Sequence, residues 1–314
     1  MDVKTQSDDI ADPPTPQEPE SGEPLTSEPE FREADAADAP AVEAEPASDT
    51  KTEEDKGESL LGFLWFLFKL LLIVLIIRSF VVSPFSIPSE SMLPRLWNGD
   101  YLLAAKWPYG FSHNSLPFDA PVFEGRVLAD TPERGDVVIF KHPIDHTDYI
   151  KRVIALPGDT VAMSNGRPIL NGTPLPRESM RDFVIPLSTN TSCAWGGERV
   201  EAADGAITCR YTRFRETLPD GRQYEVLDFG PTPGDNFAPV TIPEGHMFVM
   251  GDNRDNSRDS RFEARPGDAV GIVPLENLVG RAGIIMWSTD GSGELLKPWT
   301  WVSATRFERI GAGL

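Results

Sequence analysis

The sequence contains one long apolar run, LLGFLWFLFKLLLIVLII, which covers Leu60 to Ile77 and carries a single charge at Lys69. A helical run of this length is enough to cross the hydrocarbon core of a bilayer. A buried core helix would show a polar stripe, and this run shows none. A cleaved signal peptide would lie at the N-terminus, with a shorter apolar core and a small-residue cleavage site. The run therefore predicts an uncleaved transmembrane anchor, which we place at residues 59–82.

Residues 1–58, which precede the anchor, differ in composition from the rest of the chain. They hold 4 Lys and Arg against 19 Asp and Glu, which is −15 of the total net charge of −20, and one aromatic residue, Phe31. So few apolar side chains cannot offset the entropy cost of ordering the backbone. We predict a disordered acidic tail that is a solvated spacer or docks on a basic partner. Nothing in the composition indicates binding to nucleic acid.

Beyond the anchor the chain breaks into short apolar runs separated by Gly, Pro, Asn and Asp, with no further long helical periodicity. The clearest runs are DVVIFKH, YIKRVIAL, HMFVM and LVGRAGIIMW, at residues 136–142, 149–156, 246–250 and 278–287. Asn171-Gly172 is typical of a two-residue hairpin turn. We predict a mainly β protein, with an antiparallel β-sheet domain over residues 83–314. The stretch of about 163–245 is less regular, and we interpret it as an insertion that leaves the main sheet.

Two cysteines, Cys193 and Cys209, lie in this insertion, 16 positions apart. One disulfide would suit them if this part of the chain lies in an oxidising compartment, and two separate buried thiols are the alternative. A zinc site would need further ligands at short spacing, and the four histidines are scattered. Loop charge does not settle the orientation of the anchor, because Lys51 and Lys56 precede the apolar run closely and Arg78 and Arg95 follow it.

The segment directly after the anchor, PFSIPSESMLPRL, contains prolines that favour extended backbone, in which Ser89 and Ser91 point to the same side. A serine hydroxyl is a weak nucleophile and needs a base within hydrogen-bond reach. None of the four histidines lies in a context typical of a catalytic triad. Lys151, in YIKRVIAL, can act as the base if burial lowers its pKa. Its neighbour Arg152 would point to the opposite face of the strand.

A polar run, GDNRDNSRDSR, follows HMFVM at residues 251–261. Its side-chain oxygens suggest a calcium loop, but an EF-hand needs glycine at the sixth position, where this run has Ser257. We therefore expect no metal here. Taken alone, the run is an ordinary loop and Lys151 an ordinary solvated lysine. Their occurrence together with the serine segment favours a catalytic interpretation.

Four blocks, in order, resemble the bacterial type I signal peptidases, which use a serine/lysine dyad: the anchor with IPSESMLP, then RGDVVIFKHP, DYIKRVIALPGD and GDNRDNSRDSR. The resemblance implies that Ser91 is the nucleophile and Lys151 the general base. Ser89 would join the backbone N–H of Ser91 in an oxyanion hole. The remaining implied roles are an orienting contact from Ser257 to the lysine and an ion pair between Asp259 and Arg261. Two pockets for small side chains, one and three residues before the cut, would be lined by Phe85, Ile87, Met92, Leu96, Tyr149 and Ile150.

The resemblance implies cleavage of N-terminal signal peptides from exported preproteins at the membrane surface, with no metal or organic cofactor. The partners would be preproteins and the lipid bilayer. The implied location is the bacterial inner membrane, with one span and the catalytic domain on the outer, periplasmic face. Glu90 departs from the family, where glycine is common, and either affects the nucleophile beside it or points outward.

Other functions remain open from the sequence. A membrane-tethered β domain that binds partners without catalysis would need no paired serine and lysine. A self-cleaving protease of the repressor type would lack the anchor. A signal peptidase homologue with one specialised substrate would share every motif described above.

Overall fold

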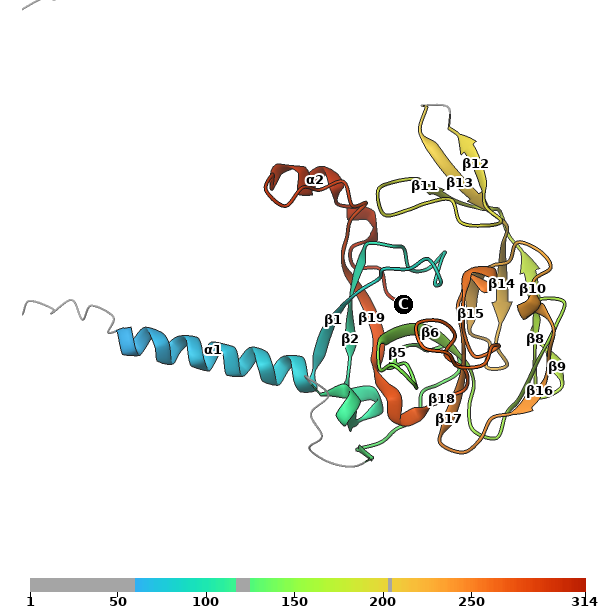
Figure 1. Ribbon diagram of the computed structural model, residues 1–314, viewed down its shortest axis with the longest axis horizontal. Helices are drawn as coiled ribbons and strands as arrows, with labels where there is room; N and C mark the ends of the chain where they lie inside the picture. The colour runs from blue at the N-terminus through green and yellow to red at the C-terminus, as the bar shows by residue number, and fades with distance from the viewer. Residues whose placement is uncertain (1–59, 117–124, 203–204) are drawn as a thin grey trace, which may run out of the picture. The chain divides into compact units, whose positions relative to one another are not determined.

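The computed structural model describes residues 60–116, 125–202 and 205–314. The predicted acidic tail at 1–58 lies outside these residues. Within them the chain forms one long apolar helix and a mainly antiparallel β domain (Figure 1). The predicted fold class is thereby confirmed for the helix and the sheet.

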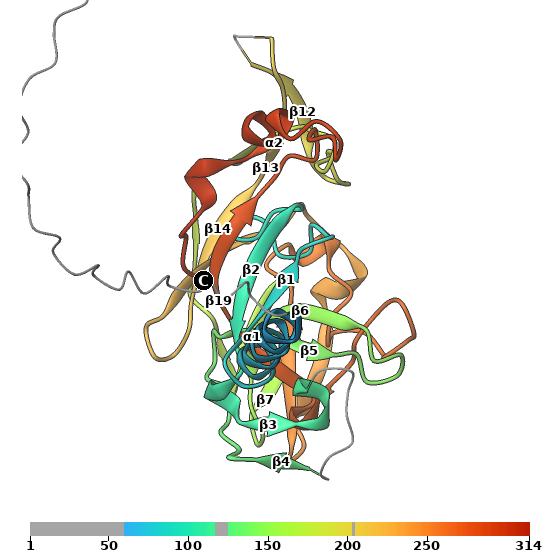
Figure 2. The ribbon, with the colours of Figure 1, turned by 90° about the vertical axis from the view of Figure 1, so that its left-hand side faces the viewer.

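Helix α1 spans Leu60–Phe80. It is the one helix in the described residues that is long and apolar enough to cross a membrane. Its apolar side chains are exposed all round, as expected for a helix without a polar stripe. The helix ends before position 82 because Val82 pairs with Ala105 and begins the first strand. Figure 2, which looks along α1, shows β1 and β2 where the helix meets the sheet.

A seven-stranded sheet forms the centre of the β domain, and all its strand pairs are antiparallel. The four strand-like runs predicted at 136–142, 149–156, 246–250 and 278–287 all lie in it as β5, β6, β17 and β19. In spatial order the strands are β1 (Val82–Ser86), β2 (Asp100–Ala105), β19 (Leu278–Ser288), β5 (Val137–Lys141), β6 (Asp148–Ala155), β17 (His246–Met250) and β18 (Val273–Pro274).

Strands β5, β6 and β17 in the middle of the central sheet are buried on both faces over most of their length, which explains their long apolar runs. In β5, Val137 and Ile139 pack into one cluster with Leu102 and Ile285. Val138 and Phe140 alternate with them and pack into a second cluster on the other face. In β6 every residue from Ile150 to Ala155 is buried, so Lys151 is removed from water together with its neighbours.

The insertion is more regular than the sequence suggested. It forms small sheets of short strands joined by hairpins, which carry too few alternating apolar residues to be recognised from the sequence. The strands of these sheets, with those that flank the insertion, are β7 (Thr160–Ser164), β8 (Arg167–Leu170), β9 (Thr173–Pro174), β10 (Arg177–Ser179), β11 (Phe183–Pro186), β12 (Glu198–Glu201), β13 (Ile207–Tyr211), β14 (Arg213–Thr217), β15 (Gln223–Leu227) and β16 (Phe237–Thr241). None of them joins the central sheet.

The predicted hairpin turn at Asn171-Gly172 is confirmed between β8 and β9. Both residues have positive φ, 51° and 78°, as a two-residue turn of this kind requires. The remaining elements are β3 (Phe111–Ser112), β4 (Arg126–Val127), helix α2 (Trp299–Ala304) and the short 3-10 turns η1 (Trp107–Tyr109), η2 (His113–Ser115), η4 (Pro233–Asp235), η5 (Arg254–Asn256), η6 (Leu275–Asn277) and η7 (Phe307–Arg309).

One buried ion pair connects the insertion to the polar run at 251–261. Arg254 Nη1 donates to Glu216 Oε1 (2.9 Å), and the second guanidinium nitrogen bonds Oε2. The Tyr224 hydroxyl also donates to Glu216 Oε2 (2.9 Å). Both charged side chains are essentially inaccessible to solvent, so each charge depends on the other for its stability in the folded state.

Replacing Glu216 with Ala should lower the free energy of unfolding by about 3–5 kcal/mol, because it leaves the Arg254 charge buried without a partner. Denaturant titration of the detergent-solubilised chain measures this loss. Glu294→Ala, which breaks the exposed pair with Lys297, is the control and should change stability little. Equal stability of the two variants would contradict the importance of the buried pair.

Candidate active site

Ser91 lies in a turn that follows β1. The Leu93 N–H donates to the Glu90 carbonyl (3.1 Å) and closes this turn, so the extended course predicted for the segment is wrong beyond Ser89. The two serines nevertheless present their hydroxyls to the same side, as predicted, with Oγ atoms 3.4 Å apart.

Asn253 holds the turn in place. Its side-chain Nδ2 donates to the Glu90 carbonyl and its backbone N–H to the Ser91 carbonyl, each at 3.0 Å. The sequence analysis did not single out Asn253. The available signal was the polar run that directly follows the buried strand β17. It marked a loop of polar side chains but did not indicate which segment Asn253 would bond.

Lys151 points from β6 at the nucleophile segment. Its Nζ donates to Ser91 Oγ (2.7 Å) and to the Ile150 carbonyl (3.0 Å). The lysine is almost completely buried, as is Ser91. Burial lowers the pKa of Lys151 to about 8, because desolvation penalises its charged form. The next residue, Arg152, pairs with Asp252 (2.8 and 2.6 Å).

The predicted ion pair between Asp259 and Arg261 is present, with Arg261 Nε 2.8 Å from Asp259 Oδ1. Burial raises the pKa of Asp259, but the Arg261 charge and hydrogen bonds outweigh it, so the net direction is downward. The ionised Asp259 raises the pKa of Lys151 and Arg261 lowers it, both by less than burial does. Desolvation therefore remains the largest influence on the pKa of Lys151.

Ser257 is buried beside this pair. The hydrogen bonds of Lys151 go to Ser91 and to the Ile150 carbonyl, and Ser257 Oγ does not bond the lysine in this structure. A side chain at Gly251 would collide with Ser257 Oγ, which shows how closely the loop packs here. The orienting role of Ser257 stays a prediction.

A cavity of about 420 Å³ opens beside Ser91 and Lys151. Four of the six residues predicted to line substrate pockets do line it: Phe85, Ile87, Tyr149 and Ile150. Asn256 and Arg258, which the sequence analysis did not single out, also line it. Phe85, Ile87, Ile139 and Ile150 form the apolar part of the lining, which we call the floor, and polar residues complete it. Such a lining suits an extended peptide with small side chains.

Met92 and Leu96 are the other two predicted lining residues. Both are fully buried and pack into the core cluster under the cavity. The turn after Ser89 directs them inward, so they support the floor from behind.

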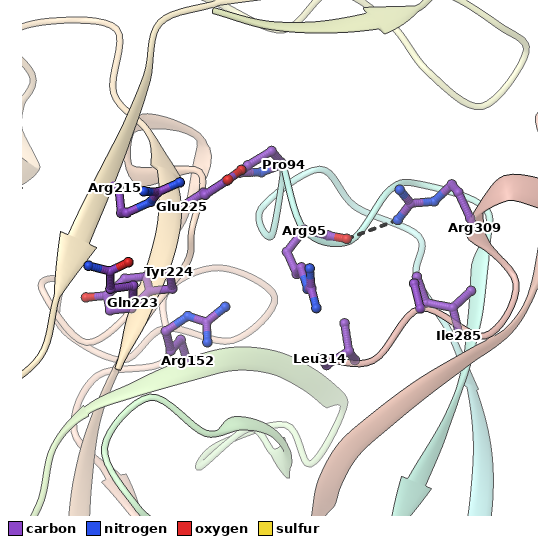
Figure 3. Close-up of a pocket in the computed structure, with 11 residues that line it drawn as sticks. Pro94, Arg95, Arg152, Arg215, Gln223, Tyr224, Glu225, Ile285, Arg309 and Leu314 are labelled. Atoms are coloured by element: carbon purple, nitrogen blue, oxygen red, sulfur yellow. Dashed lines mark hydrogen bonds between the residues drawn. The ribbon is translucent and has the colours of Figure 1, made fainter. Parts of the chain in front are cut away.

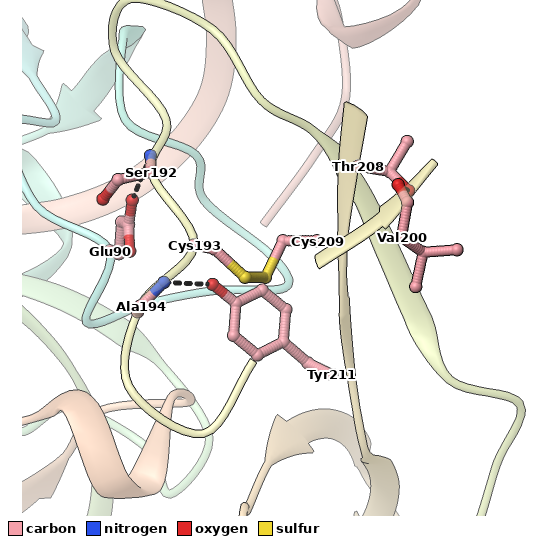
Figure 4. Close-up of a disulfide and its surroundings, with 8 residues drawn as sticks. All are labelled: Glu90, Ser192, Cys193, Ala194, Val200, Thr208, Cys209 and Tyr211. Carbon is pink, nitrogen blue, oxygen red and sulfur yellow. Dashed lines mark hydrogen bonds between the residues drawn. A yellow bond between two sulfur atoms is a disulfide. The ribbon is translucent and has the colours of Figure 1, made fainter. Parts of the chain in front are cut away.

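Cys193 and Cys209 form a disulfide, which decides between the two alternatives left open by the sequence. Figure 4 shows it next to Ser192, whose backbone N–H donates to Glu90 Oε1 (3.2 Å). The Glu90 side chain is thus directed at the insertion. In Figure 4 the disulfide also lies beside Tyr211, whose hydroxyl accepts the Ala194 N–H (2.8 Å).

A second cavity, of about 530 Å³, lies behind the nucleophile turn and is rich in arginine. Figure 3 shows Arg95, Arg152 and Arg309 around it, with Arg309 Nη2 bonded to the Arg95 carbonyl (3.0 Å). Neither Ser91 nor Lys151 lines it, so it is separate from the candidate active site. In the described parts of the chain, no cluster of His, Cys, Asp and Glu is arranged to hold a metal ion.

Comparisons with a family model and with related proteins all point to signal peptidases. The family model of signal peptidase, peptidase S26, matches residues 60–287. The chain belongs to the signal peptidase family. A signal peptidase I of Rickettsia typhi is 33% identical over 281 residues, covering 83% of this chain and 95% of the relative. A signal peptidase I of Rickettsia prowazekii is 34% identical over 257 residues, covering 76% and 88%.

A solved signal peptidase I from Enterococcus faecalis V583 matches 48% of this chain and 97% of its own length, at 21% identity and a TM-score of 0.26. That superposition is too loose to support an argument about this fold. Peptidase S26 is a family of serine proteases, and this chain is therefore a serine peptidase of that family. A serine nucleophile is expected in such an enzyme, and the hydroxyl bonded to a buried lysine is that of Ser91.

The burial that lowers the pKa of Lys151 also costs stability, so Lys151→Met should make the protein more stable at pH 7. The difference between the ordinary pKa of 10.5 and about 8 corresponds to about 3 kcal/mol, partly offset by the lost hydrogen bond to Ser91. We expect a net gain on the order of 2 kcal/mol.

The sign follows from proton binding. The folded state releases its proton before the unfolded state does, so the cost is fully present below about pH 8 and disappears above about pH 10.5. Denaturant titrations at neutral and high pH measure the difference. Arg167→Met, at an exposed position in β8, is the control. A Lys151→Met variant that is less stable than the parent at pH 7 would show that burial of the charged lysine does not destabilise the fold.

Proposed function

We propose that this protein is a serine endopeptidase that removes N-terminal signal peptides from exported preproteins, with Ser91 as nucleophile and Lys151 as general base. The single observation that carries the proposal is the 2.7 Å contact between Lys151 Nζ and Ser91 Oγ inside a buried site. Membership of the signal peptidase family supports the substrate class. The catalytic roles rest on the geometry.

The first step is transfer of the Ser91 hydroxyl proton to neutral Lys151 as Oγ attacks the carbonyl carbon of the peptide bond. The protonated lysine then gives this proton to the departing amine, and the C–N bond breaks to leave an acyl-enzyme. Water then attacks the ester as Lys151 takes one of its protons. The lysine returns this proton to Ser91 Oγ as the ester C–O bond breaks, which releases the new carboxylic acid and restores the free hydroxyl and the neutral base. A lysine whose pKa is lowered to about 8 holds enough neutral form for this role near neutral pH.

Negative charge develops on the carbonyl oxygen during both attacks. Ser89 Oγ lies 3.4 Å from Ser91 Oγ, close enough for its hydroxyl to donate to an oxygen bound at the nucleophile. The Ser91 backbone N–H is the second donor that we propose. Donors fixed by the turn cost no reorganisation as the charge forms.

Selection of the cleavage site is assigned to the apolar part of the 420 Å³ cavity. A peptide laid as a strand beside residues 86–89 directs alternate side chains to one face. Residues one and three before the cut would therefore meet the floor formed around Ile87 and Ile150. A shallow floor of this kind favours small side chains.

We further propose that cleavage takes place at the surface of the bacterial inner membrane, with the β domain on the periplasmic side. Ser91 is eleven residues from the end of α1, so it can lie at most about 40 Å from the helix end. Exposed Leu295, Leu296 and Trp299 provide apolar side chains suited to the bilayer surface. The disulfide fits an oxidising compartment. The mechanism involves no metal or organic cofactor.

Ser91→Ala and Lys151→Met should each reduce kcat/KM for a model preprotein by at least about a thousandfold, because either change removes the dyad as a unit. The measurement follows the cleaved product on a gel, with N-terminal sequencing of that product. Arg167→Met should cleave normally. Full activity in either dyad variant would leave a membrane-tethered binding domain as the better interpretation.

The rate should also depend on pH. Since the base must be neutral, kcat/KM should rise with pH, reach half its maximum near pH 8, and level off above it. Rates measured from about pH 6 to about pH 10 with one preprotein give the profile. A profile that falls through this range would contradict a lysine base.

A further inference from the structure

A smaller cavity of about 330 Å³ adjoins the substrate cavity and shares Pro88, Ser89 and Asn256 with it. Phe85, Ile87 and Ile150, which we assign to the residues before the cut, line only the first cavity. Glu90, directly before Ser91 in the chain, lines only the smaller one. A substrate bound over the first lining would extend beyond the cut bond into the smaller cavity.

Glu90 is the one ionisable side chain among the described residues that line this smaller cavity. Its carboxylate accepts the Ser192 N–H (3.2 Å) and makes no ion pair with any Lys, Arg or His that the structure describes. Burial raises the pKa of Glu90, which is the effect of removing water without supplying a positive charge. A cationic group that entered the cavity would supply that charge.

Arg306 bonds two residues that line this cavity, through the Asn98 carbonyl (3.0 Å) and Ser188 Oγ (3.3 Å), and also Thr191 Oγ1 (3.2 Å). Arg306 itself does not line the cavity. The Glu90 carboxylate therefore stays without an ion pair.

The wall opposite the nucleophile is held in place before any substrate binds. The Asn190 N–H donates to the Asp290 carbonyl (3.1 Å), and its side chain to the Thr289 carbonyl (3.2 Å). Cys193, next to Ser192, is fixed by the disulfide to Cys209. The Glu90 carboxylate is hydrogen-bonded to this wall through the Ser192 N–H. It can therefore discriminate between ligands, because the wall cannot easily move away from a repulsive one.

We propose that Glu90 makes this enzyme select the residues that follow the cut, favouring Lys or Arg at the first or second position after it and disfavouring Asp or Glu there. This inference rests on the proposed function and assigns a second specificity element to the same groove. A basic side chain would pair with the carboxylate, and an acidic one would place two like charges together in a partly desolvated space.

The test uses the full chain in detergent and preproteins that differ only in having Lys, Ala or Glu at the first or second position after the cut. For the parent enzyme, kcat/KM with Lys should exceed that with Glu by about three- to tenfold at the sensitive position. Glu90→Gln keeps an acceptor for the Ser192 N–H but removes the charge. In this variant the ratio of kcat/KM with Lys to kcat/KM with Glu should fall to about one. Glu178→Gln, an exposed change in β10, should keep the parent ratio.

A parent ratio near one at both positions, or an unchanged ratio in Glu90→Gln, would overturn the inference. Cleavage of the Ala preprotein by the parent and not by Ser91→Ala upholds the proposed function whatever these ratios are. If Glu90→Gln does not fold, the parent decides alone: its ratio should approach one as salt screens the charge, and a ratio indifferent to ionic strength overturns the inference.

Discussion

The hydrogen bond between Lys151 and Ser91 is the interaction on which the rest of the site depends, because it holds an amine in a site that is almost completely buried. A solvated lysine would be protonated and would make a poor base. Strand β6 lies between β5 and β17 in the middle of the sheet, where both faces are buried, so the lysine is desolvated by its position in the sheet. The central sheet thus has a chemical role: its burial of Lys151 sets the pKa that the proposed mechanism uses.

Three arginines fix the polar run around that lysine. Arg152 pairs with Asp252, Arg254 with Glu216, and Arg261 with Asp259. Buried ion pairs add little net stability over apolar packing, since desolvation offsets their attraction. They do penalise every other arrangement of the loop, because a shifted loop would leave charges buried alone. Asn253 depends on this loop to reach the nucleophile turn, so the position of Ser91 is determined partly by groups far from it in the sequence.

The sequence was sufficient for the features that depend on local patterns. The long apolar helix, the strands of the central sheet and the turn at Asn171-Gly172 follow from periodicity and turn chemistry. The pairing of Ser91 with Lys151 needed the resemblance to a family, because their 60-residue separation leaves no local signal. The turn after Ser89 was missed because a tertiary contact from Asn253 overrides the preference of the prolines for extended backbone. The same turn accounts for Met92 and Leu96 lying under the cavity.

The insertion contributes directly to the groove around the nucleophile, although its sequence pattern is weak. Residues 188–192 contact the nucleophile turn through Glu90 on one side and the segment after β19 through Asp290 on the other. The disulfide limits the conformations open to this stretch even before it folds. A wall ordered in advance spares the enzyme the entropy of ordering it around each substrate. The insertion therefore completes one side of the groove, while β1, the turn that follows it and β6 supply the floor and the proposed dyad, Ser91 and Lys151.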